Sequence, residues 1–194
     1  MFLTSKAPYP VERTLLTTGV LEAGVDSLHQ DQIQIKTPHL AIAYQPTAES
    51  TFWREERNHL VPTTGHKDRL APLTQKQERP LRIAVIATIY RYLSHAQHFV
   101  DRFLVGYPHA GRWHHPNMEV VSLYVDQRPV TDQSLDRARE FGITVYPTIG
   151  EALRCGGNEL AVDAVLILAE HGDYPRNQKG QICYPRYEFF KECV

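Results

Sequence analysis

The distribution of apolar and polar residues from Leu81 to Leu168 predicts strands and helices in alternating order. Leu81–Ala87 is a continuous apolar run, which is typical of a parallel strand covered on both faces. Met118–Val125, Ile143–Tyr146 and Ala161–Leu168 are predicted as three further strands. Because helical patterns separate the runs, the sequence predicts an α/β fold with a parallel, right-handed sheet and helices on both faces.

Helix boundaries in this region carry recognisable capping residues. Ser94 with Gln97, and Thr148 with Glu151, form the Ser/Thr-x-x-Glu/Gln pattern of a capping box. A third helix is predicted to begin at Thr131 or Asp132, and Gly142 and Gly156 are predicted stops. The expected buried residues of the three helices are Ala96, Phe99, Val100, Phe103, Leu104, Leu135, Ala138, Ile149, Ala152 and Leu153.

The remainder of the chain divides into an appendage and a linker. Residues 1–48 are predicted to be a small helix-strand appendage, with a helix that starts at Pro10 and a strand over His39–Tyr44. Apolar residues of the helix recur every three to five positions, which predicts one apolar face that must dock on something. Residues 49–80 are polar and proline-containing, which indicates a linker before the domain at 81–194.

Composition narrows the range of partners. The chain has 42% apolar residues, and its 21 basic residues nearly balance its 22 acidic residues. This balance gives no electrostatic case for nucleic acid or an anionic membrane as partner, and no apolar run approaches the roughly 20 residues of a membrane span. The three cysteines lack the paired spacing of a zinc site, and a cytoplasmic location is expected.

Three loops follow the predicted strands and should meet at one edge, because ligands of parallel sheets bind beyond the carboxyl ends of the strands. The first loop lacks the three glycines of the dinucleotide-binding Gly-x-Gly-x-x-Gly motif. Their positions are taken by Ala87, Ile89 and Tyr92. The helix that starts at Ser94 still offers free N–H groups for a phosphate or carboxylate. The cofactor-binding candidates here are Thr88, Tyr90, Ser94 and His95, and the alternative is that Ser94 only caps a helix.

The second loop starts with Asp126, where dinucleotide-binding folds place an acidic residue that binds the adenosine ribose. It lies further from the first strand than the usual spacing of about 20 residues, because residues 106–117 form an insertion. Arg128 is a candidate for contact with a 2′-phosphate. The alternative is a loop aspartate that only stabilises a turn.

The third loop, residues 169–177, holds the densest group of reactive side chains in the sequence. Glu170, His171 and Asp173 are the catalytic candidates, with His171 able to act as acid or base near neutral pH. A turn built around Gly172 and Pro175 is the alternative interpretation. A metal site is not predicted, since His95-x-x-His98 lacks the glutamate of the His-Glu-x-x-His motif.

The stretch 82–177 resembles the N-terminal, dinucleotide-binding half of the glucose–fructose oxidoreductase and inositol dehydrogenase family. The matching segments are 82–87, 119–126, 141–153 and 162–167. Ser94-His95, residues 125–129 and residues 170–177 more closely resemble a related group of bacterial proteins of unassigned function. Residues 8–45 resemble the C-terminal end of an oxidoreductase of the same broad family.

This resemblance implies a Rossmann-like fold, NAD or NADP as cofactor, and hydride transfer to or from a sugar or polyol. The family's Lys-Pro element and its substrate-binding sheet are absent here, so the resemblance implies a truncated domain. The first hypothesis is therefore a divergent NAD(P)-binding oxidoreductase-like module with a small-molecule ligand, inactive alone, which forms a homo-oligomer or is completed by a partner chain. The alternatives are a non-catalytic α/β binding or assembly protein, and a hydrolase or isomerase that uses His171 with Glu170 or Asp173.

Overall fold

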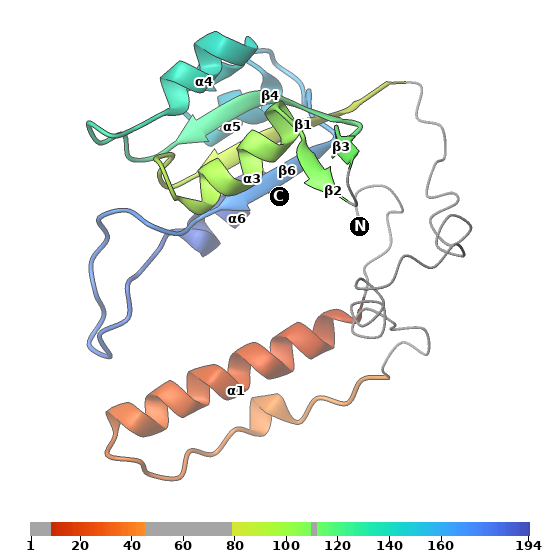
Figure 1. Ribbon diagram of the computed structural model, residues 1–194. Helices are drawn as coiled ribbons and strands as arrows, with labels where there is room; N and C mark the ends of the chain where they lie inside the picture. The colour runs from red at the N-terminus through yellow and green to blue at the C-terminus, as the bar shows by residue number, and fades with distance from the viewer. Residues whose placement is uncertain (1–8, 46–78, 110–111) are drawn as a thin grey trace. The chain divides into compact units, whose positions relative to one another are not determined.

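The computed structural model describes residues 9–45, 79–109 and 112–194 of the chain (Figure 1). The chain divides into two units, residues 1–77 and residues 78–194. The predicted linker at 49–80 lies almost entirely outside the described residues.

The first unit contains helix α1 (Val11–His29) and a single 3-10 turn, η1 (Pro38–Leu40). Gly19 is the one buried residue of α1, and the side chain of Leu40 lies so close to it that a Cβ atom would require Leu40 to shift. This contact explains why a residue that weakens helices is placed in the middle of one.

The predicted strand over His39–Tyr44 is wrong. The turn η1 covers Pro38–Leu40, and residues 41–45 have no regular structure. A strand needs a neighbour that takes up its N–H and C=O groups, and the described part of this unit contains no other strand. A single extended segment therefore gains nothing from the β conformation.

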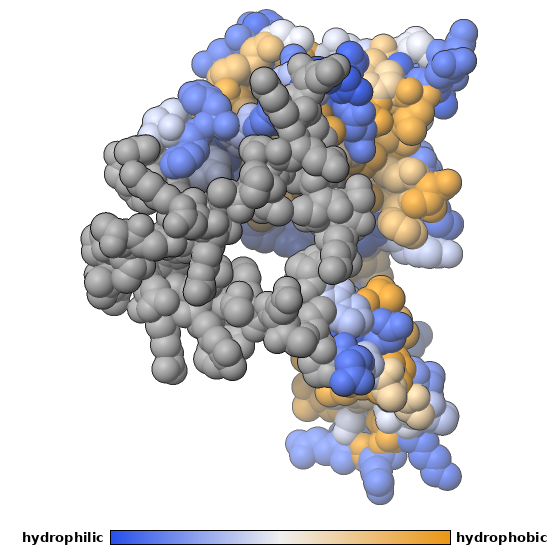
Figure 2. All heavy atoms as spheres, turned by 90° about the vertical axis from the view of Figure 1, so that its right-hand side faces the viewer, coloured by the Kyte–Doolittle hydropathy of each residue, from blue (hydrophilic) through white to orange (hydrophobic). Residues whose placement is uncertain are grey.

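The apolar residues of α1 do not form a buried face within the described residues. Five of them, Val11, Leu15, Val20, Leu21 and Leu28, are 55–72% exposed. Apolar side chains lie among polar ones on the visible surface of this helix (Figure 2). The repeated spacing of apolar residues thus predicted the helix correctly but not a packed face.

The second unit is built on a parallel sheet whose strand order is β5-β4-β1-β6. The strands are β1 (Leu81–Ala87), β4 (Met118–Val125), β5 (Thr144–Tyr146) and β6 (Ala164–Leu168). Strand β1 lies between β4 and β6, and every residue from Ile83 to Ala87 is buried. The parallel α/β sheet is confirmed. With its four strands numbered along the chain, the order is 3-2-1-4, which matches the first four strands of the Rossmann order 3-2-1-4-5-6.

Helices cover both faces of this sheet. Helices α3 (His95–Leu104) and α4 (Ser134–Phe141) pack on the face that carries Ile83, Val85 and Ala87. Helices α5 (Ile149–Arg154) and α6 (Arg186–Cys193) pack on the face that carries Ala84 and Ile86. Alternate residues of β1 therefore belong to two separate apolar clusters, which is the arrangement expected for a central parallel strand.

The predicted caps are confirmed at two helices and wrong at the third. Ser94 and Thr148 each accept a hydrogen bond from the backbone N–H three residues on. Helix α4 is instead capped by Gln133 without a side-chain bond, and the carboxylate of Asp132 accepts a hydrogen bond from the buried Ser134 hydroxyl at 2.5 Å. Because Asp132 binds this hydroxyl, the helix starts later than predicted.

Two predicted core residues are exposed. Phe99 of α3 and Leu135 of α4 have 46% and 50% of their surface exposed. Helix α3 contacts the sheet through Ala96 and Val100, whose small side chains allow a close approach but leave a narrow buried stripe. Phe99 lies outside this stripe.

The insertion at 106–117 contains a short antiparallel hairpin of β2 (Tyr107–His109) and β3 (Arg112–His114). Gly106 has a φ of +83° and lies against the backbone carbonyl of His114, so a larger residue would not fit. The indole N–H of Trp113 donates to the carbonyl of Val105 at 2.8 Å, which ties the hairpin to the end of α3. The insertion is therefore structured and anchored.

Gly142 tests the predicted helix stop. It ends α4 with a φ of +70°, and no atom outside its own chain neighbours lies within 4 Å of the position of a Cβ. We expect Gly142→Ala to lower the free energy of unfolding by about 1 kcal/mol, because a Cβ disfavours the left-handed conformation. Gly142→Asn is the matched control and should cost less, since asparagine tolerates this conformation. Urea unfolding of both variants measures the difference, and equal losses would contradict the conformational explanation.

Candidate functional site at the carboxyl edge of the sheet

The three loops predicted to meet do lie together at the carboxyl ends of β1, β4 and β6. The Thr88 hydroxyl donates to the carbonyl of Glu170 at 2.7 Å, and the Thr88 N–H donates to the carbonyl of Leu168 at 3.2 Å. The Gln127 N–H donates to the carbonyl of Thr88 at 2.9 Å. Thr88, which is fully buried, therefore joins the first loop to both of the others.

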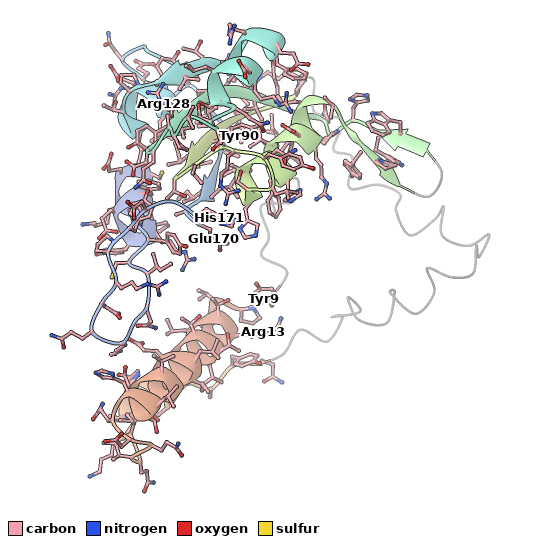
Figure 3. The ribbon with its side chains drawn as sticks, turned by 60° about the vertical axis from the view of Figure 1, so that its left-hand side comes forward. Tyr9, Arg13, Tyr90, Arg128, Glu170 and His171 are labelled. Carbon is pink, nitrogen blue, oxygen red and sulfur yellow. The ribbon has the colours of Figure 1, made fainter. Side chains whose placement is uncertain are left out.

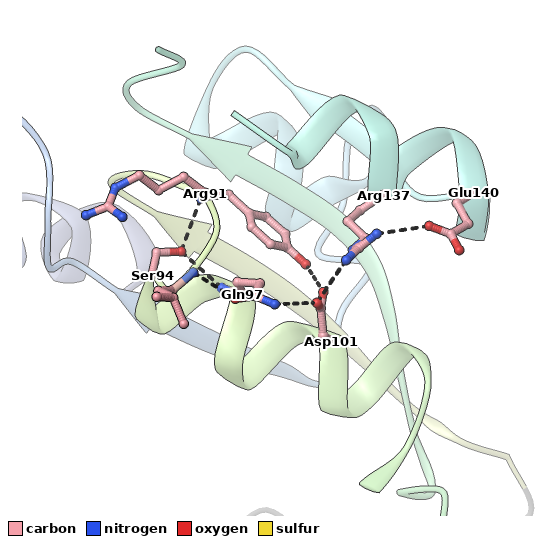
Figure 4. A network of polar contacts seen from close by, with 8 residues as sticks. Arg91, Ser94, Gln97, Asp101, Arg137 and Glu140 are labelled. Carbon is pink, nitrogen blue, oxygen red and sulfur yellow. Dashed lines mark hydrogen bonds and ion pairs between the residues drawn. The ribbon is translucent and has the colours of Figure 1, made fainter. Parts of the chain in front are cut away.

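The turn after β1 is held by a buried polar network instead of glycines (Figure 4). The Tyr90 side chain is fully buried, and its hydroxyl donates to Asp101 on α3 at 2.6 Å. Both oxygens of Asp101 also accept from the Arg137 guanidinium on α4, each at 3.0 Å. Tyr90 therefore connects the turn to two helices.

The network shifts the ionisation of its members. Burial and the hydrogen bond to Asp101 raise the pKa of Tyr90, so that its hydroxyl stays protonated. Burial alone would raise the pKa of Asp101, but the hydrogen bonds from Arg137 and Tyr90 outweigh it and leave that pKa below its usual value. Asp101 is therefore a stable anion that compensates Arg137.

Ser94 is likewise engaged in the structure of the turn. Its hydroxyl oxygen accepts hydrogen bonds from the backbone N–H groups of Gln97 and Arg91, both at 3.2 Å. The side-chain carbonyl of Gln97 accepts a hydrogen bond from the backbone N–H of Leu93 at 2.9 Å. Ser94 is fully buried and caps α3, which agrees with the capping interpretation. Its role as a cofactor-binding residue stays a prediction.

Asp126 lies at the end of β4 as predicted, but two tyrosines bind its carboxylate. The Tyr124 hydroxyl donates to one oxygen at 2.8 Å and the Tyr174 hydroxyl to the other at 2.6 Å. Burial and the hydrogen bond to Asp126 raise the pKa of Tyr124 to about 12, and the pKa of Tyr174 is raised for the same reasons. Both hydroxyls therefore remain donors at neutral pH.

The third loop crosses over to the second loop. The Gln127 amide donates to the carbonyl of Asp173 at 2.9 Å and accepts from its N–H at 2.8 Å. Asp173 thus contributes its backbone to this contact, while the residue as a whole is exposed. Arg128 is exposed and lies away from Glu170 and His171 (Figure 3). The structure consequently does not group Asp173 or Arg128 with the other candidates.

Glu170, His171 and His95 do come together. The His95 Nδ1 lies 2.5 Å from a carboxylate oxygen of Glu170, and the rings of His95 and His171 are 4.8 Å apart. The other oxygen of Glu170 lies 3.4 Å from the Arg186 guanidinium at the start of α6. The carboxylate is therefore placed between an imidazole from α3 and a guanidinium from α6.

His171 has an unusual environment. Its φ is +67°, and its Nε2 atom is buried with no hydrogen-bond partner among the described residues. Burial, together with electrostatic repulsion from His95 and Arg91, lowers its pKa. His171 therefore remains neutral at pH values where an ordinary histidine is protonated.

A pocket of about 470 Å³ opens beside these groups. Its size lies within the range of about 300–1,000 Å³ that is typical of small-molecule sites. Its three polar lining residues contact one another through Glu170, and its other lining residues are apolar. The lining residues are His95, Phe99, Ile167, Leu168, Ala169, Glu170, Arg186 and Phe190.

Sequence reasoning missed Arg186 and the role of Tyr174. The triplet Tyr-Pro-Arg occurs twice, at 174–176 and 184–186, and this repeat was the available signal. The first triplet supplies the Asp126 partner and the second supplies the Glu170 partner, while the rings of Tyr174 and Tyr184 lie edge to face at 5.6 Å. The repeat thus encloses residues 177–183 of the loop between β6 and α6.

Among the described residues no group of three His, Cys, Asp or Glu side chains is placed to hold a metal ion. The same part of the chain contains no helix that is long and apolar enough to cross a membrane. Comparison with protein-family models finds no match, and searches of curated proteins and of solved structures find no significant match. The resemblance to the glucose–fructose oxidoreductase family therefore remains a prediction.

The Asp101 network predicts a pH-dependent contribution to stability. Since the pKa of Asp101 is lowered by folding, its contribution is present above the ordinary value of about 4 and is lost as the pH falls through the lowered value. We expect Asp101→Asn to cost about 1–3 kcal/mol at pH 7, because Arg137 loses its partner, and less at pH 2.5.

Urea unfolding at both pH values measures this difference. Glu140→Gln is the control, because Glu140 also pairs with Arg137 at 3.1 Å but is exposed and should change stability by less than about 0.5 kcal/mol. An Asp101→Asn effect that is the same at both pH values would contradict the assignment.

Proposed function

We propose that residues 79–194 form a small-molecule-binding module of the oxidoreductase-like Rossmann type, in which His95 and Glu170 accept a proton from a hydroxyl group of the ligand. The observation that carries the proposal is the 2.5 Å contact between the His95 Nδ1 and Glu170, both of which line a 470 Å³ pocket. A carboxylate bound to one imidazole nitrogen fixes the ring and leaves the other nitrogen, Nε2, for a ligand.

The proposed step conserves charge and protons. The O–H bond of the ligand breaks and an N–H bond forms at the Nε2 of His95, so the ligand keeps the electron pair as an alkoxide and His95 becomes an imidazolium, whose positive charge the Glu170 carboxylate compensates. Arg186 binds the other oxygen of Glu170 and so holds the carboxylate in place. His171 stays neutral because of its environment and therefore adds no second positive charge beside His95.

Most of the residues that the sequence assigned to a dinucleotide are engaged by the protein's own hydrogen bonds. Thr88, Tyr90 and Ser94 are fully buried and form internal hydrogen bonds, and both oxygens of Asp126 accept from tyrosines. We therefore route no chemical step through NAD or NADP. His95 alone among these residues keeps a free hydrogen-bonding atom beside the pocket.

The second candidate function is nevertheless dinucleotide binding for oxidation or reduction of a sugar or polyol, as the family resemblance implies. The strand order β5-β4-β1-β6 favours it, since this order creates a crevice where the chain changes direction between β1 and β6. Binding of an adenosine ribose to Asp126 would require Tyr174 to release its carboxylate oxygen.

The proton-accepting pair is tested without a known substrate. In the full chain with ¹⁵N-labelled histidine, we expect His95 to have its proton on Nδ1 near pH 8, because Glu170 accepts a hydrogen bond there. Glu170→Gln should shift the tautomer toward Nε2–H, which is measured from the two-bond ¹⁵N–¹H spectrum. Glu188→Gln, on the first turn of α6 and outside the pocket, is the control. An unchanged tautomer in Glu170→Gln would overturn the proposed pair.

Tyr174→Phe tests the dinucleotide candidate. If Asp126 binds a ribose, removal of the competing hydroxyl should tighten NADH binding by about 3–10-fold, the value of one hydrogen bond. Tyr184→Phe is the matched control, because its ring contacts Tyr174 but it makes no hydrogen bond to Asp126. Calorimetric titration of the full chain measures the dissociation constants for NADH. If no variant binds NADH at millimolar concentration, the dinucleotide candidate is eliminated.

A further inference from the structure

The pocket at the end of β6 has a strongly uneven lining, which restricts the ligands it suits. Phe99 from α3 and Phe190 from α6 both line it, with 46% and 53% of their surfaces exposed. Ile167, Leu168 and Ala169 add further apolar surface from the end of β6. A sugar or polyol carries hydroxyl groups all around its skeleton, and most of them would lose water here without gaining a partner.

The polar side chains of the pocket leave two nitrogen atoms for a ligand, one on Arg186 and one on His95. The hydrogen bonds of Arg186 within the described residues use Nε, toward the Ala169 carbonyl, and Nη2, toward Glu170. Its remaining nitrogen, Nη1, is thus left for an anionic group such as a carboxylate. His95 uses Nδ1 for Glu170 and keeps Nε2 for a hydroxyl group.

We infer that the pocket binds a small hydroxy acid with an apolar, aryl or branched alkyl side group. The carboxylate binds Arg186, the hydroxyl group lies against His95, and the apolar group lies against Phe99, Phe190 and Ile167. This inference rests on the proposed proton-accepting role of His95 and adds the chemical class of the ligand. It also separates this site from the sugar or polyol site that the family resemblance implies.

The two phenylalanines support this class in another way. The apolar surface of an exposed aromatic ring is unfavourable in water, so covering each ring with an apolar ligand group favours binding. They come from helices on opposite faces of the sheet, so their joint position in one pocket follows from the fold and not from one amphipathic helix. A ligand that contacts both rings therefore spans the end of β6 between α3 and α6.

Titration of four compounds into the full chain separates the contributions of the hydroxyl group and of the aryl group to binding. These are 3-phenyllactate, 3-phenylpropionate without the hydroxyl group, lactate without the aryl group, and myo-inositol as a polyol. We expect 3-phenyllactate to bind most tightly, with 3-phenylpropionate weaker by about 3–10-fold and lactate by more than about tenfold. The methyl resonance of Ile167 should shift on binding, which places the ligand in the pocket.

Single substitutions in the pocket test which side chains contact 3-phenyllactate. Phe190→Ala and Arg186→Met should each weaken 3-phenyllactate binding by about tenfold or more, and thermal unfolding shows whether each variant is folded. Tyr187→Ala is the matched control on α6, because Tyr187 is exposed and does not line the pocket. Should Arg186→Met unfold, Phe99→Ala with 3-phenyllactate supplies the same test from α3.

The results distinguish the two proposals. Tighter binding of myo-inositol than of 3-phenyllactate would overturn the inferred ligand class and leave the proton-accepting pair standing. An unchanged tautomer of His95 in Glu170→Gln, with 3-phenyllactate still bound, would overturn the pair and retain the class. No binding of 3-phenyllactate at about 10 mM, a concentration at which even a weak site is occupied, would overturn the inferred class.

Discussion

The geometry of the whole site depends on the buried hydrogen bond between Tyr90 and Asp101. A tyrosine hydroxyl that is removed from water needs a partner, and a buried carboxylate needs a cation. Asp101 satisfies the first need and Arg137 the second, at 2.6 Å and 3.0 Å. The turn after β1 is thereby fixed to α3 and α4, in a protein that has no glycine at this point to make the turn by itself.

This anchored turn sets the position of everything that follows it. Thr88 at its start binds the carbonyl of Glu170, and Ser94 at its end begins α3 and presents His95. The two partners of the proposed proton-accepting pair are thus positioned by opposite ends of one turn. A change in the turn would alter the distance between His95 and Glu170 even though neither residue belongs to the Tyr90 network.

The sequence predicted the features that depend on local pattern or on chain order. Continuous apolar runs gave the parallel strands, Ser94 and Thr148 gave two caps, and strand order gave the meeting of three loops. The predictions failed where the outcome depends on which side chains meet in space. The strand at 39–44 lacked a partner, Phe99 fell outside a narrow contact stripe, and Arg186 reached Glu170 from a helix that sequence reasoning had not connected with it.

Asp126 shows most clearly why chemistry is harder to predict than fold. Its place at the end of β4 follows from the strand pattern, but its availability depends on Tyr174, which is 48 residues away in the chain. Once the loop after β6 crosses to bind Asp126 and Gln127, the carboxylate expected to bind a ribose at the end of β4 is engaged by the protein's own side chains. The same crossing leaves Glu170 at the edge of β6, so the open space and the unpaired hydrogen-bonding atoms lie beside Phe99 and Phe190. A Rossmann-like strand order can therefore retain its shared edge while the pocket at that edge is lined by β6, α3 and α6.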